Sequence, residues 1–441
     1  MPVLHTVLRP LVRHALRVYF RELELEGAED VPRSGPLLLA PNHPNTLIDV
    51  LLVAAHLDRT LRFVAKATLF KGPAGPLLRA LNAVPIARRQ DGPQEEGVDN
   101  QQTLDACELA VAQGDAVLIF PEGVSQEEPR LMRLKTGLAR IALGAQARTE
   151  EPVYVVPVAL IYDARDTFRS RARVAFTPPI DVRPFAAQDT ADDPFAPARA
   201  LTTAVKDALE PEVVHVARPE LDPLVAQLDR LYGQRVEHEI GGRLAATAAI
   251  ARAVSAFAER DPERVAQVQA QLADYARALE AAGIDDRALR RQKAPRPQDD
   301  LAFWAAAPFA VWGAVNHLLY YQLPRFVVGV LGPERLYTST VKLLVGLLAL
   351  GLCYAGQTWG IYQLGGWYAA GPYLATLPLT GFIALLWLEA LAARRRRRSV
   401  RRAARRLGPE TRRALQAQRE ALVRELDRAR VDYLADRLAE G

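Results

Sequence analysis

Short apolar runs alternate with helical patterns over the first part of the chain. Leu37–Ala40, Ala116–Phe120 and Val153–Leu160 are apolar, are bounded by Pro or Gly, and have the length of buried strands. Leu47–Leu57 and Gln101–Ala112 carry apolar residues at helical spacing. Because this alternation is typical of a sheet covered by helices, the pattern predicts an α/β fold with a central sheet flanked by helices.

The strand pattern fades after this first domain, which we expect to cover residues 21–180. Leu221–Leu231 and Val265–Leu279 repeat apolar residues at helical spacing and carry many charges. They predict a helical extension, and Lys293–Pro297 should break any helix because of its two prolines. We therefore assign residues 181–300 to a helical extension and linker.

Two apolar segments, Thr340–Leu364 and Trp367–Leu391, are long enough to cross a bilayer, which needs about 20 residues. Gly365 and Gly366 separate them, so the pair predicts a C-terminal membrane hairpin. The preceding segment, Phe303–Leu323, is less apolar, since it contains polar residues and a proline. We interpret it as interfacial or re-entrant, because three full crossings would separate the N-terminal domain from the basic segment described next.

Arginines follow the predicted membrane region, residues 301–393, and nine of them lie between Arg394 and Arg406. Such a run stays on the cytoplasmic side of a membrane. A hairpin returns the chain to its starting side, so we expect a multi-pass protein of the cell membrane whose first domain faces the cytoplasm. Residues 394–441 are assigned to this basic segment and an amphipathic helix, Glu410–Ala439. The net charge of +5 is too small to indicate a nucleic-acid binder.

The first twenty residues do not form a secretory signal, because Arg9, Arg13 and Arg17 interrupt their apolar residues. Because these arginines recur at helical spacing, we predict that residues 1–20 form an amphipathic helix on the membrane surface. A helix packed on the domain is an equal alternative. Cys107 and Cys353 give no disulfide framework and no metal-ligand spacing, which suits a reducing compartment.

The strand-to-helix turn after Ala40 carries the first candidate site. His43 and Asp49 are six positions apart, so on one helix they would lie on different faces. Pro44 favours a turn at His43, and Asp49 could then accept a hydrogen bond from the imidazole and orient it as a general base. The alternative is structural, because Thr46 and Asp49 also fit a helix-capping box.

Further candidates lie at two other strand ends. Phe120–Gly123 delivers the Glu122 carboxylate beside Gly123, whose backbone can approach a phosphate or an oxyanion. Arg88 and Arg89 follow the short strand pattern Ala83–Ala87, and Lys135 precedes a helical pattern, Leu138–Ala147. Cations in such places suit a phosphate, although ordinary surface solvation is the alternative for each.

In this order the clusters resemble the glycerolipid acyltransferase family, which includes glycerol-3-phosphate and lysophosphatidate acyltransferases. The resemblance spans about Leu23 to Pro179 and uses four motifs: Asn42-His43 with Asp49, Asn82–Arg88, Phe120–Gly123 and Val155–Leu160. Most members have four residues between His and Asp, whereas here Pro44–Ile48 makes five, and Asn82 stands where Gly is common. The longer gap, the extended block from Phe120 through Ser125, Pro129 and Lys135 to Ala145, and the hairpin resemble the branch of the fungal glycerol-3-phosphate and dihydroxyacetone-phosphate acyltransferases.

The resemblance implies the fold of that family and direct acyl transfer in phospholipid biosynthesis. His43, held by Asp49, would deprotonate the acceptor hydroxyl, while Arg88, Arg89 and Lys135 would hold its phosphate. Glu122 would bind acceptor hydroxyls, with the Gly123 backbone nearby. The donor would be acyl-CoA or acyl carrier protein and the acceptor glycerol 3-phosphate, with no metal and no cofactor.

Three alternatives remain open on the sequence. The acceptor can instead be lysophosphatidate, dihydroxyacetone phosphate or another lysophospholipid, since all present a hydroxyl and a phosphate. A non-catalytic membrane scaffold could keep the same fold. A metal-dependent hydrolase using His43 and Asp49 is disfavoured, because His56 lies thirteen residues further on and gives no ligand spacing.

Overall fold

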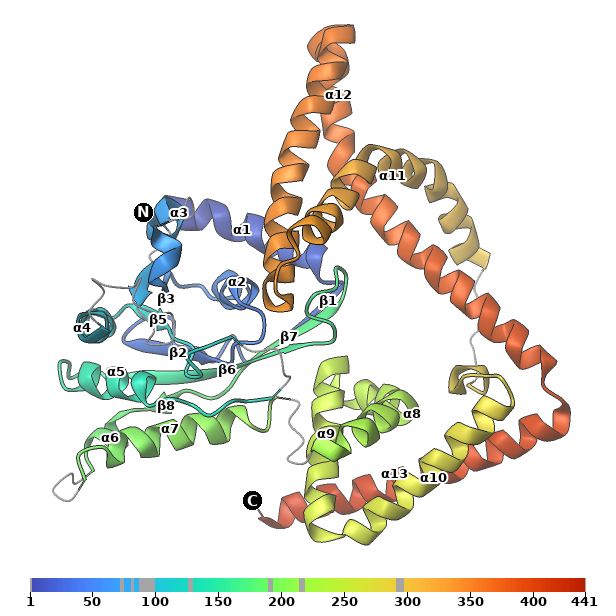
Figure 1. Cartoon of the computed structure of the whole chain (residues 1–441), viewed down its shortest axis with the longest axis horizontal. Helices are drawn as coiled ribbons and strands as arrows, with labels where there is room; N and C mark the ends of the chain where they lie inside the picture. Colours follow the sequence, from blue (N-terminus) through green and yellow to red (C-terminus); the bar gives the residue numbers. More distant parts are fainter. Residues whose placement is uncertain are drawn as a thin grey trace. The chain divides into compact units, whose positions relative to one another are not determined.

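The computed structural model describes residues 2–440 apart from 72–74, 81–82, 87–99, 126–129, 189–192, 214–218 and 291–296. The chain divides into two units, which are described separately. The first comprises residues 1–219, 235–252 and 334–340, and the second comprises 220–234, 253–333 and 341–441. Figure 1 shows the course of the chain and the labels of its elements.

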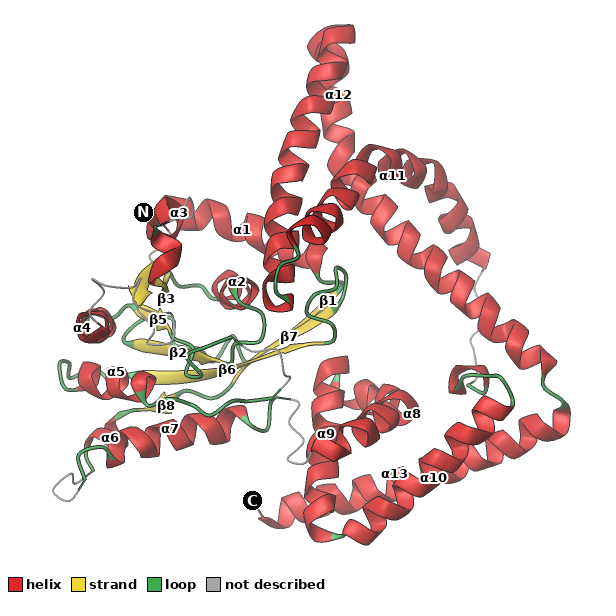
Figure 2. Cartoon of the chain, viewed as in Figure 1, coloured by secondary structure: helices red, strands yellow, loops and turns green. Residues whose placement is uncertain are grey.

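One mixed sheet forms the centre of the first unit (Figure 2). Its strands are β1 (Glu22–Glu26), β2 (Leu37–Pro41), β3 (Leu61–Lys66), β4 (Ala83–Ile86), β5 (Ala116–Leu118), β6 (Tyr154–Tyr162), β7 (Arg171–Phe176) and β8 (Ile180–Asp181). Their order is β1-β7-β6-β2-β5-β3-β4, and β8 pairs with β6. The predicted α/β class is confirmed, although the sequence pattern did not single out β1, β3, β7 or β8.

Five neighbouring strands run in the same direction, which decides where the site lies. β6, β2, β5, β3 and β4 are mutually parallel, whereas β7 runs antiparallel to β6. In this register Leu39 of β2 lies opposite Leu118 of β5 on one side and Val156 of β6 on the other. The turns that follow β2, β5 and β6 therefore leave the sheet at one shared edge, on adjacent strands.

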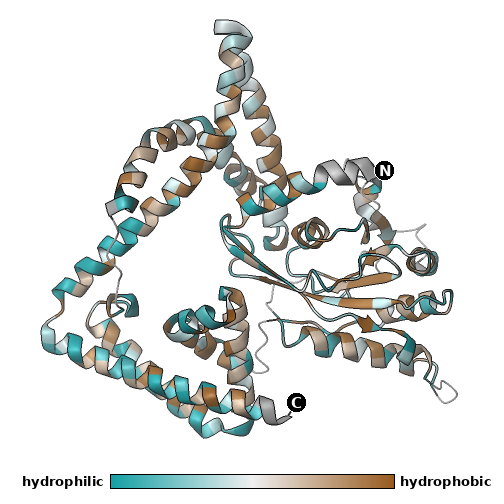
Figure 3. Cartoon of the chain, turned by 180° about the vertical axis from the view of Figure 1, so that it is seen from behind, coloured by the Kyte–Doolittle hydropathy of each residue, from teal (hydrophilic) through white to brown (hydrophobic). Residues whose placement is uncertain are grey.

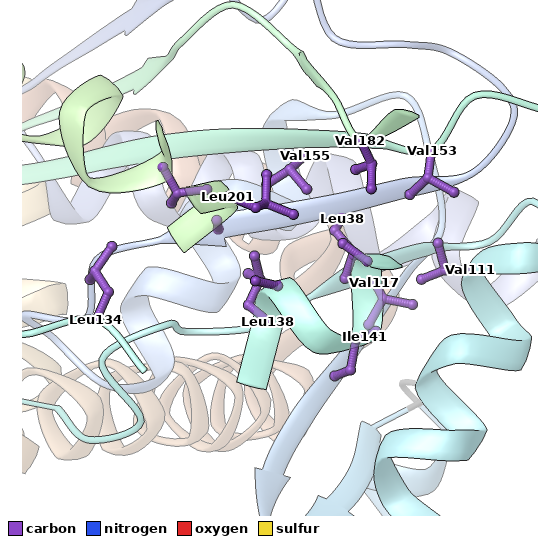
Figure 4. Close-up of a cluster of buried hydrophobic side chains, with 14 of the residues drawn as sticks. Leu38, Val111, Val117, Leu134, Leu138, Ile141, Val153, Val155, Val182 and Leu201 are labelled. Carbon is purple, nitrogen blue, oxygen red and sulfur yellow. The ribbon is translucent and has the colours of Figure 1, made fainter. Parts of the chain in front are cut away.

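Helices cover both faces of this sheet (Figure 1). In the first unit they are α1 (Pro2–Tyr19), α2 (Leu47–His56), α3 (Gly75–Ala80), α4 (Asn100–Ala112), α5 (Gly137–Gln146), α6 (Arg183–Ala186) and α7 (Ala196–Leu209). Successive residues of a strand point to opposite faces. Leu38 of β2 accordingly packs with Val111, Ile141 and Leu201 of α4, α5 and α7 in a buried apolar cluster (Figure 4).

The N-terminal helix α1 packs on α2 over its second half. Leu16 and Tyr19 are buried, and the guanidinium groups of Arg9 and Arg13 both bind the carbonyl of Ala55 near the C-terminal end of α2. Cations are favoured at that end of a helix because its carbonyls carry partial negative charge. The structure thus shows the packed arrangement for this half of α1, and the membrane-surface role stays a prediction.

The second unit contains the remaining helices and is built from long elements. α8 (Asp222–Ile240) begins in it and ends in the first unit, whereas α9 (Arg243–Arg260) begins in the first unit and ends in the second. The helices α10 (Pro262–Ala281), α11 (Pro297–Leu331), α12 (Thr338–Arg406) and α13 (Pro409–Glu440) follow. α13 is joined to α10 by ion pairs of Arg264 with Glu425 (3.1 Å) and with Asp432 (2.8 Å). These helices match the patterns predicted for the middle region and the C-terminus.

Helix α12 is a hairpin of two arms. Its helical geometry breaks at Gly365 (φ −150°) and Gly366 (φ 60°), the two residues that the sequence placed between the apolar segments. The positive φ of Gly366 is one that residues with a side chain rarely adopt. The arms are residues 338–364 and 367–406.

The first half of α11 pairs with the second arm of α12 in the antiparallel sense. The indole N–H of Trp387 donates to the carbonyl of Phe303 (2.9 Å), and the hydroxyl of Tyr373 donates to Oδ1 of Asn316 (2.6 Å). Going from Phe303 to Asn316, α11 therefore runs toward the tip of the hairpin.

The second half of α11 pairs with the first arm and runs the other way. His317 Nε2 lies 2.9 Å from the Tyr354 hydroxyl, and a Cβ on Gly346 would lie 3.8 Å from Pro324 Cγ. Since Gly346 is farther from the tip than Tyr354, α11 descends toward the base of the hairpin after His317. Helix α11 is thus an arch, as Figure 1 shows, and prolines inside a helix are a common cause of such bending.

Two helices of the described chain are long and apolar enough to cross a membrane, over Asp300–Leu331 and Arg335–Arg406. Most of each apolar stretch is exposed, and the side chains there include Trp304, Leu364 and Tyr368. Figure 3 shows hydrophobic residues along the arms of α12 and polar residues along its basic end. An exposed apolar surface of this extent marks a contact with lipid or protein.

Candidate active site

The turn between β2 and α2 holds the predicted base and its carboxylate together. β2 ends at Pro41 and α2 begins at Leu47, so His43 lies in the turn and Asp49 in the first turn of the helix. His43 Nδ1 lies 2.9 Å from Asp49 Oδ2, and both side chains are buried. Because an ionised carboxylate can only accept, a neutral imidazole in this contact has its proton on Nδ1 and its lone pair on Nε2.

Asp49 is held by two further donors. The hydroxyl of Tyr162 donates to Oδ1 (2.5 Å), and the backbone N–H of Asn45 donates to Oδ2 (2.7 Å). Burial and the neighbouring Asp49 raise the pKa of Tyr162 well above its usual value, so this hydroxyl stays protonated and remains a donor. Sequence reasoning missed Tyr162, which lies two residues beyond the predicted strand Val153–Leu160; its place just after that strand was the available signal.

Phe120 fixes the plane of the His43 ring. Its ring stacks on the imidazole with 3.5 Å between centroids and 16° between planes. Phe120 follows β5, the strand next to β2, so the adjacent strand ends bring the first and third motifs together.

Glu122 binds the backbone on both sides of the site. One carboxylate oxygen accepts from the N–H of His43 (3.0 Å) and the other from the N–H of Met132 (3.1 Å). The side chain is buried, and this burial raises the pKa of Glu122 to about 7. Glu122 therefore holds the His43 turn in place, while the acceptor-hydroxyl role expected from the sequence stays a prediction.

Gly123 and Lys135 also come together. Gly123 has φ +74°, and a Cβ there would lie 2.7 Å from Lys135 Nζ, so the ammonium group lies directly over the glycine. The backbone N–H of Lys135 donates to the carbonyl of Pro121 (2.8 Å), which fixes the loop ahead of α5. An exposed cation beside the N-terminus of a helix is a favourable place for an anion.

Asn42, the first residue of the Asn-His motif, ties the turn to β6. Its side-chain N–H donates to the Leu160 carbonyl (3.0 Å), and its Oδ1 accepts from the Leu160 N–H (2.6 Å). The amide thereby imitates one further residue of a strand, because a primary amide offers the same donor and acceptor as a peptide group. The hydrogen bonding between β2 and β6 therefore continues past Pro41 to Asn42, the residue before His43.

Thr46 is the N-cap residue of α2, but its side chain makes no capping hydrogen bond to that helix. The alternative in which Thr46 and Asp49 form a capping box is therefore wrong for Thr46. Its backbone has φ 46° and ψ −119°, which costs a residue with a side chain on the order of 1–3 kcal/mol. Its hydroxyl instead lies 2.8 Å from the hydroxyl of Thr340. Strain of this kind persists where surrounding contacts over-determine the conformation.

The other predicted phosphate ligands, Arg88 and Arg89, lie outside the described residues, as do Asn82 and Pro129 of the family motifs. Strand β4, which precedes the two arginines, ends at Ile86 and is parallel to β3. Their role remains a prediction.

The region that carries these motifs is similar to known proteins. Residues 22–161 match the family model named Acyltransferase. Glycerol-3-phosphate O-acyltransferase 2 of Saccharomyces cerevisiae is 31% identical over 204 residues, which is 45% of this chain and 27% of that protein. The 1-acyl-sn-glycerol-3-phosphate acyltransferase alpha of Mus musculus is 24% identical over 39% of this chain and 56% of its own length. The lyso-ornithine lipid O-acyltransferase of Rhizobium meliloti is 31% identical over 134 residues, which is 30% of this chain and 43% of that protein. The chain thus spans between about a quarter and just over half of these relatives.

Proposed function

We propose that the protein moves a fatty acyl chain from a thioester to a hydroxyl of glycerol 3-phosphate, because residues 22–161 match the family model named Acyltransferase. The donor is acyl-CoA or acyl carrier protein, and the product enters phospholipid biosynthesis. The observation that carries the proposal is the buried His43–Asp49 pair, 2.9 Å apart, inside the region that matches the family.

The proposed reaction is a direct transfer. Nε2 of His43 takes the proton of the acceptor hydroxyl while that oxygen attacks the thioester carbonyl. Asp49 stabilises the imidazolium that forms, as an orienting carboxylate does in other acyl-transfer sites. The carbon–sulfur bond then breaks, and the thiolate, whose conjugate acid has a pKa of about 8.5, leaves readily. The proton on His43 passes to the thiolate, which restores the starting state.

The phosphate of the acceptor is proposed to bind at the Gly123 turn. Lys135 lies over Gly123 and precedes the N-terminus of α5, so a charged side chain and helix-end N–H groups act on the same place. Arg88 and Arg89 are proposed to complete this binding. Glu122, which anchors the adjacent turn, is proposed to orient the acceptor hydroxyls as well as the backbone of His43.

Lysophosphatidate is the second candidate acceptor. It carries the same phosphate and a free hydroxyl, and the mouse relative is named for this acceptor. Dihydroxyacetone phosphate fits the same groups. The yeast relative, named for glycerol 3-phosphate, supports the order in which we rank them.

The bilayer is the proposed partner of the second unit. The two arms of α12 are proposed to cross the membrane, with α11 as a re-entrant arch in one leaflet, because both of its halves pair with the hairpin on the way in and out. The arginines after the second arm favour the cytoplasmic side for the base of the hairpin. The catalytic domain then faces the cytoplasm.

An acceptor assay tests this proposal. Protein purified in detergent is supplied with labelled palmitoyl-CoA, or the corresponding acyl carrier protein, and with glycerol 3-phosphate, dihydroxyacetone phosphate or lysophosphatidate. Labelled lysophosphatidate from glycerol 3-phosphate is the expected product. Product from lysophosphatidate alone would move the enzyme to the second candidate, and no product with any pair would refute the acyltransferase function.

A further inference from the structure

The segment at the start of α12 contacts the catalytic turn through side chains that the proposed chemistry does not use. Residues 334–340 belong to the first unit, together with the sheet and its turns. Thr340, in the first turn of α12, places its hydroxyl 2.8 Å from that of Thr46. Ser339 beside it is buried and donates to the carbonyl of Arg165 (2.5 Å).

The loop that contains Arg165 also forms hydrogen bonds with the turn between β2 and α2, and so connects Ser339 to that turn. The Arg165 guanidinium donates to the carbonyl of Pro44 (3.2 Å), and the side-chain N–H of Asn45 donates to the carbonyl of Arg165 (3.2 Å). Asn45 in turn donates its backbone N–H to Asp49. Each residue between His43 and Leu47 therefore forms a hydrogen bond with the Arg165 loop or with Thr340.

These bonds matter because the turn is not relaxed. Thr46 has a backbone conformation that residues with a side chain rarely adopt, and its side chain makes no capping bond to α2. A conformation of this kind needs support from its surroundings. The hydroxyl of Thr340 gives the Thr46 side chain a hydrogen-bonding partner from outside the turn.

We infer that Thr340, supported by Ser339, is a positioning residue for the proposed acyl transfer: through Thr46 it holds the turn that sets His43 against Asp49. This inference rests on the proposed function, and it assigns part of the active-site support to the first turn of α12. The proposed chemistry does not use Thr340 itself, which acts through Thr46. Its loss should lower kcat and leave the binding of the acyl donor unchanged.

The test compares Thr340→Val with Thr340→Ser in the full-length protein. Valine keeps the shape and removes the hydroxyl, whereas serine keeps the hydroxyl. We expect about a tenfold fall in kcat for valine, which corresponds to loss of one hydrogen bond. The KM for palmitoyl-CoA should stay within about twofold. Serine should restore most of kcat. Thr376→Val is the matched control, since the hydroxyl of Thr376 binds a carbonyl of its own helix.

A reciprocal pair, Thr46→Val and Thr46→Ser, tests the same bond from the other side if Thr340→Val does not fold. The double variant Thr46→Val with Thr340→Val should be no slower than the slower single variant, because both remove one interaction. A fully active Thr340→Val, or equal impairment by valine and serine, would overturn the inference. Neither result would bear on the proposed function, which the acceptor assay on the unaltered protein tests separately.

Discussion

The hydroxyl of Tyr162 lies 2.5 Å from Oδ1 of Asp49, the carboxylate whose other oxygen binds His43. Tyr162 is the last residue of β6, and His43 follows β2, the strand beside it. The sheet therefore supports the proposed catalytic pair, His43 and Asp49, from two strands at once.

Tyr162→Phe should lower kcat by about tenfold or more. A hydrogen bond to a charged group is worth about 1.5–3 kcal/mol, and its loss leaves a buried carboxylate with one donor fewer. Steady-state kinetics with palmitoyl-CoA and glycerol 3-phosphate measure the change. Tyr154→Phe, at the other end of the same strand, is the control and should behave as the unaltered protein. Equal rates for all three proteins would show that the hydroxyl of Tyr162 does not support the reaction.

The raised pKa of Glu122 predicts that the free energy of unfolding depends on pH. Its pKa is about 7 in the folded protein and near 4.5 when exposed, so between these values the folded state binds the additional proton. This contribution to stability is complete below pH 4.5 and is lost as the pH rises through 7, by about 3 kcal/mol in total.

Thermal unfolding in detergent at several pH values measures this contribution. The melting temperature of the unaltered protein should fall relative to that of Glu122→Gln as the pH rises from 5 to 8. Parallel curves for the two proteins would contradict the shifted pKa. Glutamine should also reduce activity, because its amide N–H₂ cannot accept one of the two backbone N–H groups that the carboxylate binds.

Lys135→Ala should raise the KM for glycerol 3-phosphate by about tenfold and change kcat much less, because the ammonium group is proposed to bind a phosphate that does not react. Arg140→Ala removes the same charge from the exposed face of α5 and serves as the control. An unchanged KM for Lys135→Ala would show that the phosphate binds elsewhere.

The membrane arrangement predicts which positions a membrane-impermeant maleimide reaches from outside the cell. In a variant without Cys107 and Cys353, a single cysteine at Tyr368, at the tip of the hairpin, should react. Single cysteines at Leu301 and Gly332, at the two ends of α11, should both stay unreacted until the cells are opened. Opposite behaviour of these two positions would mean that α11 crosses the bilayer.

The sequence predicted those parts of the fold that local pattern determines. The buried strands β2 and β6 appear as apolar runs, and Gly365 with Gly366 marks the break in α12, because a glycine pair between apolar segments has few other uses. Strand β1 was missed because its alternating Glu and Leu residues are too polar to resemble a buried strand. β7 was missed as well, since arginines interrupt its apolar residues.

The candidate site divides in the same way. Motif order and spacing predicted His43, Asp49 and Glu122, which lie in the turns and in the helix start that follow predicted strands. The roles of Tyr162 and Thr340 depend on which strand ends and which distant segment lie beside the turn, 113 and 294 residues away along the chain. Pairings at such separations follow from the tertiary structure and leave no local pattern.

The most direct test of the central claim compares His43→Ala with the unaltered protein in acyl transfer from labelled palmitoyl-CoA to glycerol 3-phosphate. His238→Ala, an exposed histidine of α8, is the control for a histidine change away from the site. If His43 is the general base, its loss should reduce kcat by about 10²–10⁴-fold, while the control keeps its activity. A His43→Ala protein with near-normal turnover would contradict the account.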